Sequence, residues 1–213
     1  MYMQYTQNYS FNIYIDISGR TKETQYFGLI AINSNKMHNF LKHFEREFPG
    51  LLKRKIKGTK LNKNRLEKIM KFIDKEKVLF TSTYISHDEK VALKKLFPNK
   101  AFFYERLVGS SYFRLLERVT KKKTSINYNI TLCEDNQLDS KKARNYARFL
   151  LKSNKREAKL TAGLMRDIPE LKFADFIASA HRKMEFKKLS KFKHYKNCPP
   201  KIDSRIITRV FEK

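Results

Sequence analysis

The sequence has few of the residues that make up flexible linkers, with 6 glycines and 5 prolines among 213 residues. Flexible connections are usually rich in glycine or proline, so little of the chain is available for long linkers. A chain of this length can form one substantial core or two small ones. We therefore expect one domain over residues 1–185, followed by a basic C-terminal extension over residues 186–213.

Cysteine is also rare, and the two cysteines, Cys133 and Cys198, lie far apart without a CxxC pair. This argues against a disulfide framework and against a zinc site, so two free thiols are expected. The first ten residues lack the basic and then apolar blocks of a signal peptide. No apolar run approaches the roughly 18 residues that a membrane span requires. We expect a cytoplasmic location and no membrane partner.

Acidic residues are the most consequential shortage, because 21 acids stand against 47 lysines and arginines and leave a formal charge of +26. Such an excess repels itself in a compact fold and is normally compensated by a partner. Thermophile surfaces also raise lysine content, but they raise glutamate with it. The expected partner is therefore a nucleic acid, DNA or RNA. The sequence does not indicate the oligomeric state.

Two hydrophobic periods alternate along the chain and indicate its fold class. Alternating or β-branched segments predict strands, at residues 11–16, 21–33, 77–86 and 125–132. The first two form a hairpin with a turn at Ser18-Gly19-Arg20, and a further short strand is expected within 161–169. Helical spacing predicts helices, at residues 36–48, 65–77, 89–97, 103–119, 140–154 and 169–184. Asp88 is the expected N-cap of the third helix. The mixture predicts an α/β domain on one mixed sheet.

Basic residues collect in three segments: 53–77 has 11 Lys/Arg against 3 acids, 141–159 has 8 against 1, and 182–213 has 11 against 3. Such clusters can contact phosphates. The candidate nucleic-acid-binding residues are Lys53, Arg54, Lys55, Lys57, Lys60, Lys141, Lys142, Arg144, Arg148, Lys187, Lys188, Lys191 and Lys193. The alternative is that the first two segments are solvated helix faces.

Aromatic rings interleave with the lysines of the last segment, namely those of Phe186, Phe192, His194 and Tyr195. Rings in such a setting can stack on unpaired bases. The alternative is a helix whose rings pack on the core.

Carboxylates stand at the ends of expected elements. Asp16 ends the first strand, Glu134 and Asp135 end the strand at 125–132, and Asp175 lies in the small-residue run of the last helix. Gathered together, these acids could hold Mg²⁺ or Mn²⁺, which prefer oxygen ligands. Two such ions activate water and stabilise the leaving oxygen of a phosphodiester. The alternative for each acid is a local role in a turn, a loop or an exposed helix position.

Four segments carry a resemblance to a known family. FNIYIDISG resembles the opening Tyr-x-Asp-Glu-Ser-Gly of the proteins catalogued as domain of unknown function 3800. RKIKGTKL resembles that family's Glu-Ile-Lys segment, INYNITLCEDN its apolar strand ending in an acid, and IPELKFADFIASA its closing Ala-Asp helix. Order and rough spacing agree over residues 11–182.

The resemblance implies an RNase H-like fold, with a central mixed sheet flanked by helices, and a metal-dependent nuclease. It implies that Asp16, Glu134 (or Asp135) and Asp175 are the metal ligands and catalytic acids, and that Lys57 contacts the scissile phosphate.

The chain departs from the family pattern at two positions, because Ile17 and Lys55 stand where the family has glutamates. Each change removes a carboxylate, which leaves open a site with one ion, a contribution from Asp139 or Glu105, or no ion at all. The alternative functions are binding of DNA or RNA without cleavage, on the same scaffold, and a structural role in a nucleoprotein complex. His181, six residues after Asp175, is expected on the surface.

Overall fold

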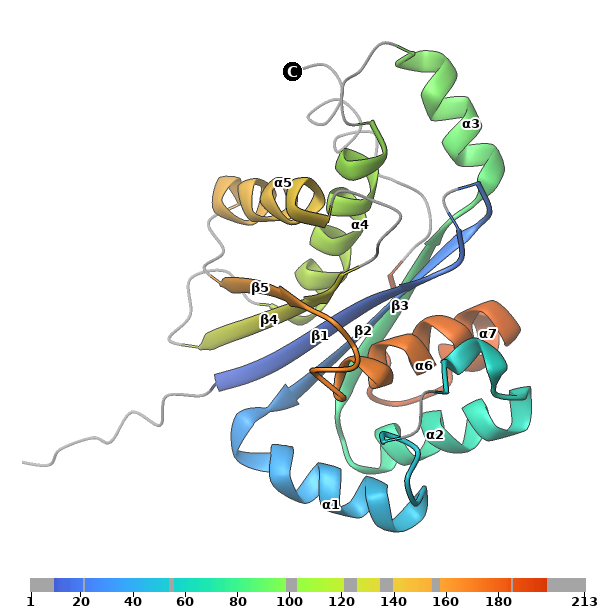
Figure 1. Ribbon diagram of the computed structural model, residues 1–213, viewed down its shortest axis with the longest axis vertical. Coiled ribbons are helices and arrows are strands. Elements are labelled where there is room, and N and C mark those ends of the chain that lie inside the picture. The colour runs from blue at the N-terminus through green and yellow to red at the C-terminus, as the bar shows by residue number, and fades with distance from the viewer. Residues whose placement is uncertain are drawn as a thin grey trace, which may run out of the picture.

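The computed structural model describes residues 10–20, 22–53, 56–98, 103–120, 126–134, 140–154, 158–184 and 186–198. Its centre is a five-stranded mixed sheet with the order β3-β2-β1-β4-β5 (Figure 1). The strands are β1 (Ser10–Ser18), β2 (Gln25–Asn33), β3 (Leu79–Ile85), β4 (Asn127–Cys133) and β5 (Lys159–Gly163). β1, β2 and β3 pair antiparallel, whereas β4 pairs parallel with β1 and with β5. The predicted α/β class is confirmed.

The first two strands form the predicted hairpin, but β1 extends through Ser18 and β2 begins at Gln25 and not at residue 21. Its turn contains Gly19, whose φ of +105° is a left-handed conformation that side chains rarely adopt. Four apolar residues of β1 alternate with polar or amphipathic ones, as a half-buried strand requires. β2 is buried along nearly its whole length because strands flank it on both sides and helices cover both its faces.

Helices form a layer on each face of the sheet (Figure 1). They are α1 (Met37–Glu47), α2 (Lys63–Lys75), α3 (His87–Leu96), α4 (Phe103–Val119), α5 (Ser140–Ser153), α6 (Leu171–Lys183) and α7 (Phe186–Leu189), with short 3₁₀ turns η1 (Ser34–Lys36) and η2 (Gly58–Lys60). One core joins the sheet to α4 and α5. A second core joins the opposite face to α1, α2 and α6.

Strand alternation decides which side chains enter each core. Ile13 and Ile15 of β1 pack with α4 and α5, whereas Tyr14 packs with the α6 side. Asp16 has the parity of Tyr14, so it points toward α6. The same rule places Gly28 and Ile30 of β2 on the α6 side, since Ile30 belongs to that core.

The basic extension is packed against the domain over its described residues, 186–198. Lys196 N–H donates to the Phe80 carbonyl at 2.8 Å, and Tyr195 forms a parallel bridge with Phe80. The extension thereby covers the outer edge of β3, which would otherwise present unpaired backbone groups. Tyr195 is buried and Phe192 packs beside it against Phe80. For these two rings the packing alternative holds, and the expectation that they stack on bases is corrected.

Two further local expectations are corrected. The N-cap of α3 is Ser86, whose Oγ accepts from Glu89 N–H at 3.0 Å, while Asp88 lies in the first turn. Ser86 has the extended conformation that a cap requires, and Asp88 within the first turn still interacts favourably with the helix dipole. The short fifth strand spans 159–163 and is followed by turns. Within the described residues, no helix has the length and apolarity to span a membrane.

Candidate functional site

Asp16 lies at a point where a helix approaches the sheet closely. It pairs directly with Gly28 across β1 and β2 and is 7% exposed. A Cβ atom on Gly28 would lie 2.6 Å from the backbone nitrogen of Ala178 and would also overlap the carbonyl of Ala174. Glycine is therefore required at position 28 for α6 to pass over the Asp16–Gly28 pair. The backbone of α6 at Ala174, next to Asp175, consequently lies against the residue paired with Asp16.

Asp175 is the buried acid of α6, with 4% of its surface exposed. Its Oδ2 accepts a hydrogen bond of 2.6 Å from Gly58 N–H, and its Oδ1 accepts one of 3.3 Å from the Ser179 hydroxyl. Burial raises the pKa of this carboxyl above its ordinary value of 3.8, although both hydrogen bonds and the charges of Lys57 and Lys172 oppose the rise. A carboxyl with a raised pKa in a polar setting is a typical feature of functional sites.

The η2 turn is fixed to α6 by further contacts. A Cβ on Gly58 would lie 2.7 Å from Ser179 Oγ, so this close approach also needs glycine. Lys183 Nζ donates to the carbonyls of Thr59 and Leu61 at 2.6 Å each. Lys57 directly precedes the turn and is exposed. The turn therefore holds an exposed lysine near a buried acid, with its backbone fixed from two sides.

Glu134 does not share the face of Asp16. Tyr128, Ile130 and Leu132 of β4 pack toward α4 and α5, and position 134 has their parity. Its N–H continues the strand ladder by donating to the Gly163 carbonyl at 3.0 Å, and its side chain is exposed.

The strand neighbour of Asp16 on β4 is Cys133. Ile15 pairs with Leu132, so the register continued by one residue sets Cys133 beside Asp16, on the same face. Asp135, Asp139, Arg54 and Lys55 lie outside the described residues. Among the residues that are described, no group of three histidines, cysteines or acids is placed to hold a metal ion.

The described residues of the basic clusters divide between the two helical layers. The first and third clusters lie side by side, because Asp74 of α2 accepts hydrogen bonds from the backbone N–H of His194 at 2.7 Å and, at 3.1 Å, interacts with its ring Nδ1. The second cluster is on α5, across the sheet (Figure 1). The exposed candidates are Lys53, Lys57, Lys60, Lys141, Lys142, Arg148, Lys187, Lys188, Lys191 and Lys193, whereas Arg144 is half-buried.

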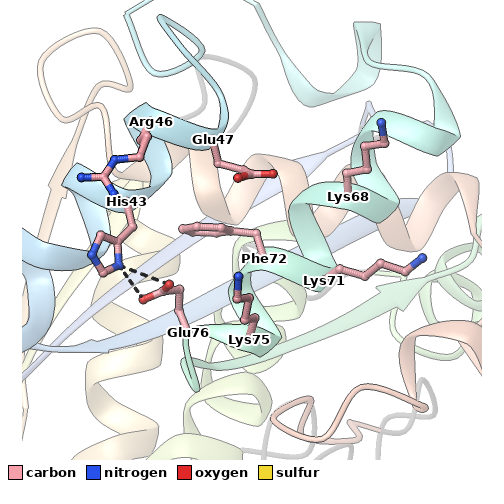
Figure 2. A pocket seen from close by; sticks show the side chains of 8 residues that line it. All are labelled: His43, Arg46, Glu47, Lys68, Lys71, Phe72, Lys75 and Glu76. Atoms are coloured by element: carbon pink, nitrogen blue, oxygen red, sulfur yellow. Dashed lines mark hydrogen bonds and ion pairs between the residues drawn. The ribbon is translucent and has the colours of Figure 1, made fainter.

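A groove between α1 and α2 is lined by several lysine and arginine side chains (Figure 2). It has a volume of about 640 Å³. Its lining residues are His43, Arg46 and Glu47 from α1 and Lys68, Lys71, Phe72, Lys75 and Glu76 from α2 and its C-cap. His43 Nδ1 lies 3.3 Å from both carboxylate oxygens of Glu76 and links the two walls. The sequence clusters identified the α2 wall, but Arg46, the α1 cation that lines the groove, was missed because it lies in a segment of mixed charge.

His181 is a buried residue, contrary to the surface position expected from sequence. It is 5% exposed, and its ring contacts Tyr26 and Tyr84 edge-on at centroid distances of 5.6 and 5.5 Å. Burial lowers the pKa of His181 to about 4, so the ring is neutral at physiological pH. The six-residue spacing predicts that His181 and Asp175 point in different directions, and their contacts do differ. The direction in which His181 points is occupied by Tyr26 and Tyr84 of the sheet, and these rings bury it.

Comparisons with known proteins establish the fold. The scan against protein-family models finds no match, and the search of curated proteins finds none. Solved structures do match. One is the ribonuclease H2 of Pyrococcus horikoshii, with a TM-score of 0.56 and 15% identity, over 92% of this chain and 83% of that one. Another is RNase HII of Archaeoglobus fulgidus, solved in complex with PCNA, with a TM-score of 0.52 and 14% identity, over 86% and 77%.

A third match is Bst-RNase HIII in complex with Mn²⁺, with a TM-score of 0.53 and 12% identity. This chain is covered over 86%, but it spans only 54% of the length of that protein. Together with the mixed sheet flanked by helices, these matches show that the fold is RNase H-like, as the sequence resemblance implied. At these identities the likeness concerns the fold.

Proposed function

We propose that this protein is a nuclease that cleaves phosphodiester bonds with the help of divalent ions held by carboxylates. The observation that carries the proposal is that Asp16 and Asp175 are both buried, and that α6, which carries Asp175, passes directly over Gly28, the residue paired with Asp16. Acidic side chains are rarely buried, and this chain, of formal charge +26, buries two of its few acids. The solved structures with the same fold include an RNase HIII with Mn²⁺ bound, which supports the assignment.

The chemistry of the two acids fits a hard divalent cation. Their carboxylates supply the oxygen ligands that Mg²⁺ and Mn²⁺ prefer. A bound ion would compensate for the burial that raises the pKa of Asp175. When bound, such ions supply activation of water and stabilisation of the leaving oxygen. A third carboxylate would come from Glu134, Asp135 or Asp139. Of these three acids the structure describes only Glu134, whose strand parity places it on the opposite face of the sheet from Asp16.

The protein's own cations have separate roles in this proposal. The exposed Lys57, next to the anchored η2 turn, is placed to contact a phosphate near Asp175. The cations of the α1–α2 groove, Arg46, Lys68, Lys71 and Lys75, would bind the nucleic-acid backbone away from the cleavage point. The expected affinity therefore falls steeply with salt.

The competing function is binding of DNA or RNA without cleavage. One specific observation favours it: Asp175 already accepts two hydrogen bonds, and no third described acid joins it. A cleavage assay on labelled DNA and RNA, single- and double-stranded, with Mg²⁺, Mn²⁺ or EDTA separates the two. The nuclease predicts cleavage that EDTA abolishes, whereas the binding protein predicts salt-sensitive retention of intact substrate under every ion.

A further inference from the structure

The α4–α5 surface has an exposed aromatic side chain at a position that packing does not explain. Phe149 of α5 is 57% exposed. Its ring centroid lies 6.0 Å from that of the half-buried Tyr146, with 31° between the ring planes. The two rings border a cavity of about 290 Å³, whose other lining residues are Glu105, Arg106, Lys142 and Asn145.

The structure holds the inner ring of this pair firmly. α5 approaches α4 at Gly109, where a Cβ would lie 2.7 Å from the Ala143 carbonyl and 3.1 Å from the side chain of Tyr146. The Arg106 guanidinium lies 5.8 Å from the Tyr146 ring centroid, within the range of a cation–π contact. Tyr146 is therefore fixed against α4, and Phe149 stands beside it with most of its ring open to solvent.

The charge around the cavity indicates an anionic partner. α5 contains five lysines and arginines and no acid. Lys142 and Arg106 line the cavity itself, with Glu105 as the one acid of its lining. An apolar protein partner or an acyl chain would require a wider apolar area than one phenylalanine. A flat ring with a phosphate beside it matches both the exposed aromatic face and the cations.

We propose that the α4–α5 surface binds an unpaired nucleobase, which stacks on Phe149 while its phosphate contacts Lys142. The inference rests on the proposed function for the ligand class, and it adds that the protein engages single-stranded nucleic acid on this face of the sheet. The base must be unpaired, because the faces of paired bases in a duplex are already stacked on one another. The groove between α1 and α2 lies in the opposite layer (Figure 1), and its two rings are the buried Phe72 and the imidazole of His43, which is engaged with Glu76.

The test compares a single-stranded oligonucleotide with the same strand carrying abasic sites, which keep the phosphates and lack the bases. Binding is measured in EDTA by fluorescence anisotropy, so that cleavage does not contribute. For the unaltered protein, abasic substitution is expected to weaken binding about five- to a hundredfold, the range that stacking on one aromatic ring provides. Phe149→Ala is expected to cause the same loss on the normal strand and no further loss on the abasic strand.

Three variants serve as controls. Phe149→Tyr keeps a ring and is expected to restore the preference for bases. Leu96→Ala removes the described large hydrophobic with the greatest exposure, 69%, and is expected to leave both affinities unchanged. Lys142→Gln is expected to weaken the normal and abasic strands equally, because it removes a phosphate contact alone. Circular dichroism verifies that each variant is folded.

Equal binding of normal and abasic strands by the unaltered protein overturns the inference, as does an unchanged base preference in Phe149→Ala. Either result can occur beside metal-dependent cleavage, so it removes this site and leaves the nuclease proposal intact. Absence of any binding to nucleic acid overturns both. Cleavage lost with EDTA while the Phe149 effect persists supports this site independently of the catalytic one.

Discussion

Gly58 N–H donates a hydrogen bond of 2.6 Å to the Asp175 carboxylate, although the two residues are 117 positions apart in the chain. This contact joins the loop before α2 to the helix that crosses the sheet beside Asp16. It also positions Lys57, the residue before Gly58, close enough for its charge to lower the pKa of Asp175. The contact thus connects one candidate metal ligand, Asp175, to the candidate phosphate-binding lysine.

Asp175→Asn is expected to stabilise the protein in EDTA at neutral pH. Burial raises the pKa of Asp175 above 3.8, so the folded chain holds the proton more tightly than the unfolded chain. The stability contributed by this carboxyl therefore falls as the pH rises from 3.8 through the folded pKa. Asparagine removes the ionisation and keeps an oxygen for Gly58 N–H. Urea midpoints should be higher for the variant at pH 7, and the difference should shrink toward pH 4.

Divalent ions reverse this ranking if the metal proposal is correct. Mg²⁺ or Mn²⁺ at a hundredfold excess over its Kd would stabilise the unaltered protein by about 2.7 kcal/mol. The same ions should stabilise Asp175→Asn far less. A thermal shift that is equal in both proteins would show that Asp175 binds no ion.

His181 is expected to make the fold sensitive to acid. Its pKa is lowered from 6.5 to about 4 by burial, so in this interval the unfolded chain binds more protons than the folded one. Stability therefore falls as the pH drops from 6.5 to 4, by about 3 kcal/mol at 1.36 kcal/mol per pKa unit. His181→Phe keeps a ring against Tyr26 and Tyr84 and should lack that part of the loss. Denaturant titrations at both pH values measure it, and an identical loss in the two proteins would contradict the assignment.

Replacing two cations of the α1–α2 groove is expected to change the salt dependence of binding. Lys68 and Lys75 are exposed and line the groove one heptad apart. If each contacts one phosphate, the double change to glutamine should lower the slope of log K against log salt by about 2, at roughly 0.9 per contact. The matched control is Lys22→Gln with Lys95→Gln, which removes the same charge from exposed positions outside the groove. Equal slopes for the two double variants would exclude the groove as a binding surface.

Gly28→Ala tests the close approach of α6 to the sheet. The added methyl group would overlap the backbone of Ala174 and Ala178, neither of which can move without displacing α6. We expect a loss of about 1–3 kcal/mol in the free energy of unfolding. Asn39→Ala, on the exposed face of α1, should stay within about 0.5 kcal/mol of the unaltered protein. An unchanged free energy of unfolding in Gly28→Ala would mean that α6 does not approach the sheet closely at the Asp16–Gly28 pair.

The elements of this fold were predictable because their patterns are local. The alternation of residues 126–132 and the helical spacing of residues 169–184 depend only on neighbouring residues. Both predictions are confirmed, by β4 and α6. Asp16 at a strand end could be singled out in the same way. Its burial with Asp175 could not be derived, because it depends on α6 meeting the sheet at Gly28.

The remaining differences arise from tertiary contacts. No residue near His181 in the sequence indicates its contacts with Tyr26 of β2 and Tyr84 of β3, which bury its ring. The packing of Tyr195 on Phe80 likewise joins residues 115 positions apart, and it changes a candidate base-stacking ring into part of the core. Glu134 and Asp135 were equally acceptable by pattern, and only the register of β4 with β1 shows that Glu134 has the opposite parity to Asp16.

The most direct test of the central claim is a cleavage assay in Mn²⁺ or Mg²⁺ that compares the unaltered protein with Asp16→Asn, Asp175→Asn and Glu134→Gln. The account predicts cleavage by the unaltered protein and a loss of at least about 100-fold in rate for the first two variants, since a bound ion contributes several kcal/mol to the transition state. Glu134→Gln should lose much less, and binding in EDTA should survive in all four. Cleavage that persists in Asp16→Asn or in EDTA, or no cleavage by any of the four proteins, would contradict it.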